Sequence, residues 1–467
     1  MSDSVSKTPS ALRYYQSILE TVGNTPLVRL NSVTKGLKPL VLAKLESFNP
    51  GKSNKDRVGI HIVEMAEKDG TLKPGGTIVE ATSGNTGLGL ALAAAVKGYK
   101  CICVMPDKVG QEKRDILKAH GARVVITPTS APPGSPDRYT EVARRLASEI
   151  PGGFLANQYF NPHNRGIHYL TTGPEIWRDT AGRVTCYVAS LGTGGSTSGA
   201  GRYLKEQNPN VRVVGVEPAG SILGEFQRTG KMVESAPYLV EGIGQEIIPG
   251  NVQFQYIDEI LTVTDRESFQ LMRRLSREEG IFVGGSSGTA LAGALKVAGR
   301  MTKDDVIVVM LPDTGERYLS KFHSDGWLAD HGMLDAGEMR VGDLLRQKAA
   351  GGDLPPLLSL GPADPVRAAL TLIRRHHVSQ LPVVTAAGEV VGTVVEPHLF
   401  AAVLDGRATP EAAVSTVMEA PLPRLSADEP VAAATRMLTS GHALLVEDKG
   451  KPVGILTRID VIGYAAR

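Results

Sequence analysis

Two glycine-rich turns are the segments of this sequence whose residue types could bind a charged ligand. The first, 82–87, reads ThrSerGlyAsnThrGly between an apolar strand and a helical stretch. Small hydroxyl side chains and free N–H groups at a helix start suit a carboxylate. The second, 190–199, reads SerLeuGlyThrGlyGlySerThrSerGly and has enough glycine for backbone N–H groups to surround a phosphate. Because both turns follow strands of one expected sheet, we expect a ligand at the carboxyl ends of those strands.

Each turn alone is a weak signal, since a strand-to-helix turn needs glycine for purely conformational reasons. Neither turn fits a nucleotide fingerprint. The lysine of a Walker A loop is missing after Gly194, and the acidic residue expected about twenty positions after a dinucleotide motif is matched only loosely by Glu217. The sequence therefore indicates a phosphate on a molecule smaller than a nucleotide.

Four ordered motifs resemble the β-family of pyridoxal phosphate enzymes. AsnProGlyLysSerAsnLysAspArg from Asn49 is followed by the two turns and by GlyGlySerSerGly from Gly284. Over residues 11–325 the chain resembles cysteine synthase and, more closely, cystathionine β-synthase. The C-terminal region resembles the pair of CBS domains that cystathionine β-synthases carry and cysteine synthases normally lack.

The resemblance implies a cofactor, pyridoxal 5′-phosphate, and a role for each matching residue. A lone lysine is usually a solvated surface charge, but Lys55 matches the lysine that bonds to the cofactor aldehyde and acts as base on the substrate Cα proton. Asn85 matches the amide that holds the cofactor's ring oxygen. Ser286 matches the hydroxyl facing the pyridine nitrogen, where a neutral group favours β-elimination over transamination. The phosphate loop would comprise Gly192, Thr193, Gly194, Gly195 and Ser196.

The same resemblance places the substrate. Its carboxylate would lie on Thr82, Ser83, Thr86 and Gln158. Tyr159 would supply or relay a proton to a poor leaving group, although a core aromatic with a satisfied hydroxyl is the alternative. Gly242 belongs to a GluGlyIleGly segment that matches a mobile loop over the site. Gln245 stands where the family often has Tyr, which leaves the role of that contact open.

Neither haem nor a metal is expected. Some cystathionine β-synthases bind haem through an N-terminal Cys and His, and residues 1–40 contain neither. The CysXaaXaaCys of some relatives is replaced after the phosphate loop by residues 207–210. Cys101, Cys103 and Cys186 lie in apolar runs, which is typical of reduced core residues. The sequence lacks a Cys/His set at metal-ligand spacing.

The elements that must position these residues follow an alternating pattern. From 77 to 311, β-branched runs alternate with amphipathic helical stretches, which predicts an α/β fold. The resemblance implies two subdomains with parallel-rich twisted sheets covered by helices, as in the tryptophan synthase β type. The run from Val306 is apolar on both faces, as in the interior of a doubly wound sheet. We expect a catalytic domain over 1–330 and a linker rich in Ala, Gly and Pro over 331–356.

An internal repeat follows. AspProValArgAlaAla from Asp364 is similar to GluProValAlaAlaAla from Glu429, and we expect two α+β CBS domains, 357–405 and 412–467, packed on each other. Thr457 and Asp460 come where a strand ends and a helix begins, and could hold the ribose of S-adenosylmethionine or an adenine nucleotide. A helix N-cap pair is the alternative. The first copy lacks the pair, so at most one adenosyl effector is expected per chain.

Composition bounds the partners. The 467 residues are 42% hydrophobic and 21% charged with net charge +2, typical of a soluble chain of several domains without a field for nucleic acid. No apolar run is long enough to cross a bilayer and the N-terminus lacks the pattern of a signal peptide, so we expect a cytoplasmic protein. Active sites of this class close near subunit contacts, which favours a homodimer or higher homo-oligomer.

The leading hypothesis is a carbon–oxygen lyase, a hydro-lyase that condenses L-serine with L-homocysteine to cystathionine and water, in transsulfuration toward cysteine. The alternative enzyme uses O-acetylserine, with sulfide or homocysteine as acceptor, because acceptor residues are not legible in the sequence. A third hypothesis is a non-catalytic sensor of adenosyl ligands. It is disfavoured because a scaffold needs neither the lysine, nor the phosphate loop, nor the pyridine-facing serine.

Overall fold

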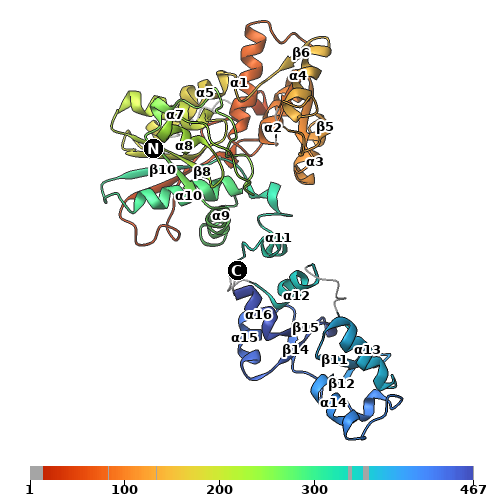
Figure 1. Cartoon of the computed structure of the whole chain (residues 1–467). Coiled ribbons are helices and arrows are strands. Elements are labelled where there is room, and N and C mark those ends of the chain that lie inside the picture. Colours follow the sequence, from red (N-terminus) through yellow and green to blue (C-terminus); the bar gives the residue numbers. More distant parts are fainter. Residues whose placement is uncertain (1–13, 83, 133, 335–338, 351–356, 466–467) are drawn as a thin grey trace, which may run out of the picture. The chain divides into compact units, whose positions relative to one another are not determined.

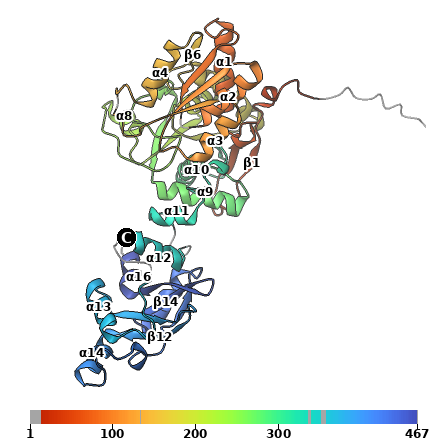
Figure 2. The ribbon, with the colours of Figure 1, turned by 90° about the vertical axis from the view of Figure 1, so that its right-hand side faces the viewer.

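The computed structural model describes residues 14–82, 84–132, 134–334, 339–350 and 357–465. The chain separates into two compact units, Met1–His323 and Ser324–Arg467. The first unit contains two open sheets covered by helices, and the second contains two small sheets with their own helices (Figures 1 and 2).

A six-stranded sheet forms the larger half of the first unit, in the order β1-β2-β10-β7-β8-β9. Its first pair is antiparallel and every other pair is parallel. The apolar strand β10 is buried along its whole length between β2 and β7, as its sequence predicts. The strands are β1 Leu27–Arg29, β2 Leu40–Leu45, β7 Cys186–Ser190, β8 Arg212–Pro218, β9 Glu259–Val263 and β10 Val306–Leu311.

A four-stranded parallel sheet, β5-β4-β3-β6, forms the smaller half. Its strands are β3 Thr77–Ala81, β4 Lys100–Pro106, β5 Arg123–Thr127 and β6 Gly153–Leu155. Cys101 and Cys103 on β4 and Cys186 on β7 are free and buried. The predicted α/β class with two parallel-rich sheets is confirmed. The expectation that both glycine-rich turns follow strands of one sheet is wrong, because the first turn follows β3 of the smaller sheet and the second follows β7 of the larger one.

The helices of the first unit cover both sheets, and four of them begin within the sequence motifs. They are α1 Lys55–Lys68, α2 Asn85–Lys97, α3 Gln111–Ala119, α4 Tyr139–Glu149, α5 His163–Ile167, α6 Gly173–Asp179, α7 Gly195–Gln207, α8 Leu223–Thr229, α9 Asp265–Glu279 and α10 Gly285–Ala298. A π-helical turn, η3 His168–Thr172, joins α5 to α6, and short 3-10 turns include η2 Glu46–Phe48 and η5 Gly315–Tyr318. The motif helices are α1, α2, α7 and α10.

The second unit contains the predicted repeat. Its first copy pairs β11 with β12, and its second pairs β13, β14 and β15. The elements are α11 Asp325–Asp330, α12 Val341–Ala350, α13 Val366–His376, β11 Gln380–Val384, β12 Val390–Val395, α14 Glu396–Leu404, β13 Arg424–Ser426, α15 Val431–Ser440, β14 Ala443–Asp448, β15 Lys451–Thr457 and α16 Arg458–Ala465. The α+β character predicted for this region is confirmed.

The predicted linker, 331–356, contains a helix. The N–H groups of Val341 and Gly342 at the start of α12 each donate to a carbonyl of the second repeat at 2.8 Å, and Leu344 is buried. Helix α12 therefore packs as part of the second repeat, while 335–338 and 351–356 lie outside the described residues. Within the described ranges, none of the helices is both long and apolar enough to span a membrane.

Candidate active site

Lys55 is the first residue of α1, and its side chain is half-buried. Its Nζ donates to Asn54 Oδ1 at 2.9 Å. Burial lowers the pKa of the Lys55 amine to about 8, while the carboxylates of Asp313 and Glu46 act in the opposite direction. A lysine whose pKa lies this close to neutral pH can serve as a nucleophile and as a base.

Asn85, the first residue of α2, lies in a polar group with three residues from the segment after β10. Its Nδ2 donates to Asp313 Oδ2 at 2.8 Å, and its Oδ1 accepts from Arg317. Tyr318 also donates to Asp313 Oδ2, at 2.7 Å. The Asn85 amide is therefore held from both ends, which leaves one hydrogen of Nδ2 for another acceptor.

The segment 192–196 joins β7 to α7 and has the geometry of an anion cradle. Gly194, the N-cap of α7, has φ +84°, a conformation that favours glycine. A Cβ on Gly195 would overlap the Asn164 amide, so glycine lets this backbone approach its neighbour. The hydroxyl of Thr197, in the first turn of α7, is buried without a hydrogen-bond partner within the described part of the chain. The first N–H groups of α7 point out of the start of the helix, toward the 192–196 segment.

Ser286 lies in the first turn of α10 and is 5% exposed. The neighbouring Ser287 hydroxyl is fully buried, and no partner for it is found among the described residues. The start of α10 therefore has two buried serine residues, and the role of Ser286 toward the cofactor stays a prediction.

Three of the four residues predicted to hold a carboxylate, Thr82, Thr86 and Gln158, lie together at the start of α2. The Thr82 hydroxyl accepts from the N–H groups of Gly84 and Gly87 at 3.0 and 3.3 Å. Thr86 donates to Gln158 Oε1 at 2.5 Å, and Gln158 Nε2 donates to the Ala81 carbonyl at 3.3 Å. All three side chains are buried. Ser83 lies outside the described residues.

Tyr159 is half-buried, and its hydroxyl lies 3.4 Å from the Tyr139 hydroxyl. Burial, with the neighbouring Tyr139, raises the pKa of the Tyr159 phenol well above its usual range. The phenol is therefore protonated at physiological pH and is able to donate.

The loop that contains Gly242 is held by ion pairs. Glu241 forms ion pairs of 2.6 Å with Lys113 of α3 and with Lys321. Gly242 has φ +83°, and its carbonyl lies against Gly192 of the phosphate loop. The N–H of Gly244 donates to the Leu191 carbonyl at 2.8 Å. The loop predicted to be mobile therefore lies against the 192–196 segment in this structure. Gln245 contacts Ser221 through its backbone N–H, at 3.0 Å.

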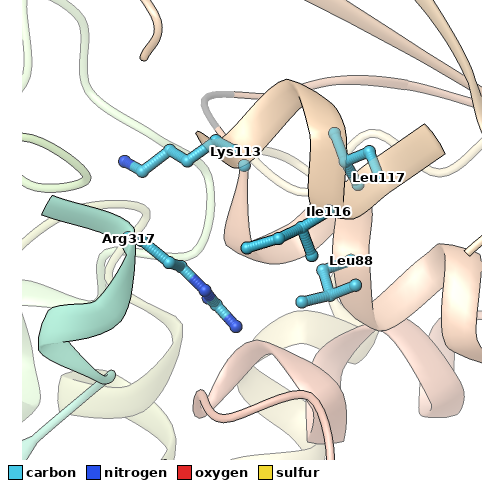
Figure 3. A pocket seen from close by; sticks show the side chains of 6 residues that line it. Leu88, Lys113, Ile116, Leu117 and Arg317 are labelled. Atoms are coloured by element: carbon cyan, nitrogen blue, oxygen red, sulfur yellow. The ribbon is translucent and has the colours of Figure 1, made fainter. Parts of the chain in front are cut away.

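A small pocket opens beside this loop. Figure 3 shows Lys113 of α3 and Arg317 of η5 at its rim, with three aliphatic side chains completing the wall. The lining also includes Gly84, which precedes α2, so the pocket adjoins the start of the Asn85 helix. Its lining residues are Gly84, Leu88, Lys113, Ile116, Leu117 and Arg317.

In the second unit, the carboxylate of Asp460 is engaged by neighbouring residues. It accepts from the N–H and hydroxyl of Thr457 at 2.7 and 2.8 Å, and from Lys348 Nζ of α12 at 2.9 Å. These contacts fit the helix-start alternative given above for the pair. Binding of an adenosyl ligand at Thr457 and Asp460 stays a prediction.

Sequence reasoning missed several residues that the fold brings to the site. Asp313, Arg317 and Tyr318 follow β10 at its carboxyl end, and that position was the available signal. Asn164 was also missed, although its Nδ2 links the Gln158 carbonyl, at 2.7 Å, to the Thr193 hydroxyl of the phosphate loop, at 2.9 Å. No pattern in the sequence marks Lys113 or Lys321.

Two protein-family models match this chain. Residues 18–313 match the model of pyridoxal-phosphate dependent enzymes, and residues 352–405 and 414–467 match that of the CBS domain.

Individual relatives and solved structures are also similar. The chain is 38% identical over 460 residues to a cystathionine beta-synthase of Dictyostelium discoideum, covering 96% of this chain and 92% of that protein. It is 40% identical over 481 residues to that of Oryctolagus cuniculus, covering 99% and 86%. The structure of an O-acetylserine dependent cystathionine beta-synthase from Helicobacter pylori is 38% identical, with TM-score 0.62, covering 66% of this chain and 99% of that one. A hydrogen sulfide-producing enzyme from Fusobacterium nucleatum is 36% identical, with TM-score 0.61, covering 66% and 100%.

Proposed function

Since the chain belongs to the cystathionine β-synthase family of pyridoxal-phosphate dependent enzymes, we propose that it condenses L-serine with L-homocysteine to L-cystathionine and water. The observation that carries the proposal is the pair of lysines around Glu241. Lys113 and Lys321 share the single carboxylate of Glu241, which leaves one net positive charge beside the site, and this charge suits an acceptor that carries its own carboxylate. Sulfide has no carboxylate and would gain nothing specific from that charge.

The described residues fit the cofactor of this family. Gly192–Ser196, with the buried Thr197 hydroxyl, would hold the phosphate. Asn85 would donate its remaining N–H to the ring oxygen, and Ser286 would face the pyridine nitrogen. Lys55 would bond to the aldehyde carbon. When bound, pyridoxal phosphate supplies an electron-withdrawing ring that takes up the electrons of the breaking Cα–H bond.

The chain's own residues would then divide the work of the reaction. Thr82, Thr86 and Gln158 would hold the carboxylate of the donor amino acid, and so fix its Cα near Lys55. The Lys55 amine, freed once the donor's amino group has displaced it from the aldehyde carbon, would remove the Cα proton, since its pKa of about 8 leaves part of it uncharged near neutral pH. The docked loop around Gly242 would exclude water from the activated donor.

The leaving group favours serine as donor in this proposal. Hydroxide leaves only with a proton, whereas acetate leaves from O-acetylserine without one. Tyr159 is protonated throughout the physiological range, as an ordinary phenol already is, and burial raises the pKa of its phenol further. A protonated phenol near the site supports a role as the proton donor to the departing hydroxyl.

The donor is tested by the kinetics of purified full-length enzyme. With homocysteine as acceptor, kcat/KM for serine should exceed that for O-acetylserine, and Tyr159→Phe should lower the serine value while leaving the O-acetylserine value within about twofold. The same comparison with sulfide as acceptor is the control for acceptor choice. A clear preference for O-acetylserine with sulfide would contradict the proposal and support the cysteine synthase alternative.

The acceptor is tested by a charge-removing substitution. Lys113 is 4% exposed and paired with Glu241. The Lys113→Met substitution removes its positive charge and keeps a side chain of similar length. We expect KM for homocysteine to rise about tenfold, the loss of roughly one charge-assisted hydrogen bond, with KM for sulfide unchanged.

Lys118→Met is the matched control, because Lys118 lies on the same helix with its side chain 58% exposed. It should leave both KM values at the wild-type level. An equal rise of both KM values in Lys113→Met would instead indicate a general disturbance of the loop.

A further inference from the structure

Asp313 is a buried carboxylate that the proposed reaction leaves without a role. It stands two residues after β10 and is 1% exposed. Its Oδ2 accepts from Asn85 Nδ2 at 2.8 Å and from the Tyr318 hydroxyl at 2.7 Å. Its Oδ1 is buried and has no hydrogen-bond partner within the ranges that the structure describes. A buried carboxylate oxygen with an empty acceptor position is costly, and such atoms are common at functional sites.

The backbone around Asp313 is fastened to the residues that precede Lys55. Asp313 forms an antiparallel bridge with Ser53, and the Asn54 N–H donates to the Pro312 carbonyl at 2.9 Å. Asn54 in turn accepts from Lys55 Nζ at 2.9 Å. One rigid frame therefore fixes the lysine and the carboxylate relative to each other.

We propose that Asp313 is a positioning residue of the reaction: it orients the Asn85 amide toward the cofactor's ring oxygen, and its Oδ1 accepts a hydrogen bond from the protonated Lys55. The proposal rests on the proposed roles of Lys55 and Asn85. In the step concerned, Lys55 Nζ would take the proton of the breaking Cα–H bond, whose electrons the bound cofactor would take up. Asp313 stays ionised and supplies the counter-charge.

The orientation part follows from the amide's contacts. Arg317 donates to Asn85 Oδ1, and Asp313 accepts one hydrogen of Nδ2. An ionised carboxylate accepts hydrogen bonds and donates none. The Asn85 amide therefore cannot flip without placing its oxygen against the Asp313 carboxylate. The second N–H of Nδ2 is therefore the donor of this amide that remains for a ligand.

The counter-charge part follows from the charges around Lys55. Among them, Asp313 acts most strongly to raise the pKa of the amine, followed by Glu46. Glu46 is already paired with Arg57, at 2.8 Å. The nearby His168 is neutral, because burial lowers its pKa to about 3.

The other charged groups near Asp313, namely Arg317 and Asp56, also form hydrogen bonds. Arg317 lies close to Asp56 and donates to the Gly51 carbonyl, and Asp56 accepts from the Gly51 N–H at 2.6 Å. The Asp56 Oδ1 atom is likewise buried without a hydrogen-bond partner among the described residues, but burial raises the pKa of the Asp56 carboxyl to about 7, so that group is partly protonated near neutral pH. Asp313 is the carboxylate that acts most strongly on the Lys55 amine.

The test compares Asp313→Asn with wild type as full-length holoenzyme. Loss of the carboxylate destabilises the Lys55 ammonium, so the pKa of Lys55 falls and the acid limb of the kcat profile should move to lower pH by about one unit. The Asn85 amide loses its fixed orientation, so the absorption band of the bound cofactor should shift and cofactor affinity should fall about tenfold. Glu316→Gln, an exposed neighbour paired with Lys52, is the control and should change none of these.

Tyr318→Phe separates charge from structure, because it removes the other hydrogen bond to Oδ2 and keeps the carboxylate. Its acid limb should stay at the wild-type pH; a shift equal to that of Asp313→Asn would overturn the counter-charge role. An Asp313→Asn enzyme with reduced kcat but unchanged pH profile and spectrum would overturn the whole inference. If Asp313→Asn does not fold, Asn85→Ser takes its place. It should shift the absorption band of the cofactor and leave the acid limb at the wild-type pH, and any other result would overturn the inference. Borohydride trapping of wild type on a residue other than Lys55 would instead refute the proposed function.

Discussion

Replacing Lys55 by alanine should abolish β-replacement, with turnover falling by at least about a thousandfold. The amine is the only lysine at the start of a motif helix, and its lowered pKa of about 8 suits both covalent attachment and proton removal. Without it, cofactor retained by the phosphate loop alone should be lost on dialysis. The measurements are kcat with serine and homocysteine, the visible absorbance of the dialysed protein, and the mass of the borohydride-reduced chain.

Lys68→Ala is the control for Lys55→Ala. Lys68 ends the same helix and is exposed, so Lys68→Ala removes one lysine of this helix and leaves the Lys55 amine and the helix start untouched. Wild-type absorbance and turnover are expected. A Lys55→Ala enzyme that still gave a reduced cofactor adduct and turned over would show that another amine does the chemistry, and with it the assignment of α1 would fail.

The cofactor side of the site was predictable because it is written locally. Each motif leads into a helix, and its glycines and small polar residues are contiguous, so sequence alone indicates a helix start with free N–H groups. The structure places Lys55, Asn85, Gly195 and Ser286 at or within one residue of the first position of α1, α2, α7 and α10. Local sequence determines such positions irrespective of the rest of the fold.

The other side of the site depends on contacts between distant segments. Asn85 and Asp313 are 228 residues apart, and Glu241 lies 128 residues from Lys113. An isolated Asp or Lys has no distinguishing neighbours in the sequence, and only the sheet order and the docking of the loop bring these groups together. The Thr457 and Asp460 pair shows the converse limit: its spacing suits a ribose or a helix start, and spacing alone does not choose between them.

The contact between α1 and α2 is the feature on which the alignment of Lys55 with Asn85 depends. A Cβ on Gly89 would overlap the carbonyl oxygen of Lys55, and a Cβ on Gly59 would overlap the backbone of Gly89 and Leu90. The two helices therefore meet backbone to backbone, and no side-chain rearrangement can make room at this contact. Both helices begin at a site residue, so a shift of either displaces the lysine from the amide.

Gly89→Ala should therefore damage both stability and activity. Forcing a methyl group between the two backbones costs about 1–3 kcal/mol of folding free energy. A displacement of α1 by about 1 Å relative to α2 would lower kcat roughly a hundredfold, because proton transfer and substrate positioning require matched geometry. The checks are the thermal midpoint of the holoenzyme, cofactor affinity and kcat.

Gly166→Ala is the matched control, since Gly166 is helical in α5 with open space at its Cβ position, and it should behave as wild type. A Gly89→Ala enzyme that is clearly destabilised but keeps the wild-type kcat would contradict this prediction. Lys55 would then be held by the Asn54–Pro312 and Ser53–Asp313 contacts alone, so the backbone after β10, and not the contact between α1 and α2, would set the position of the lysine.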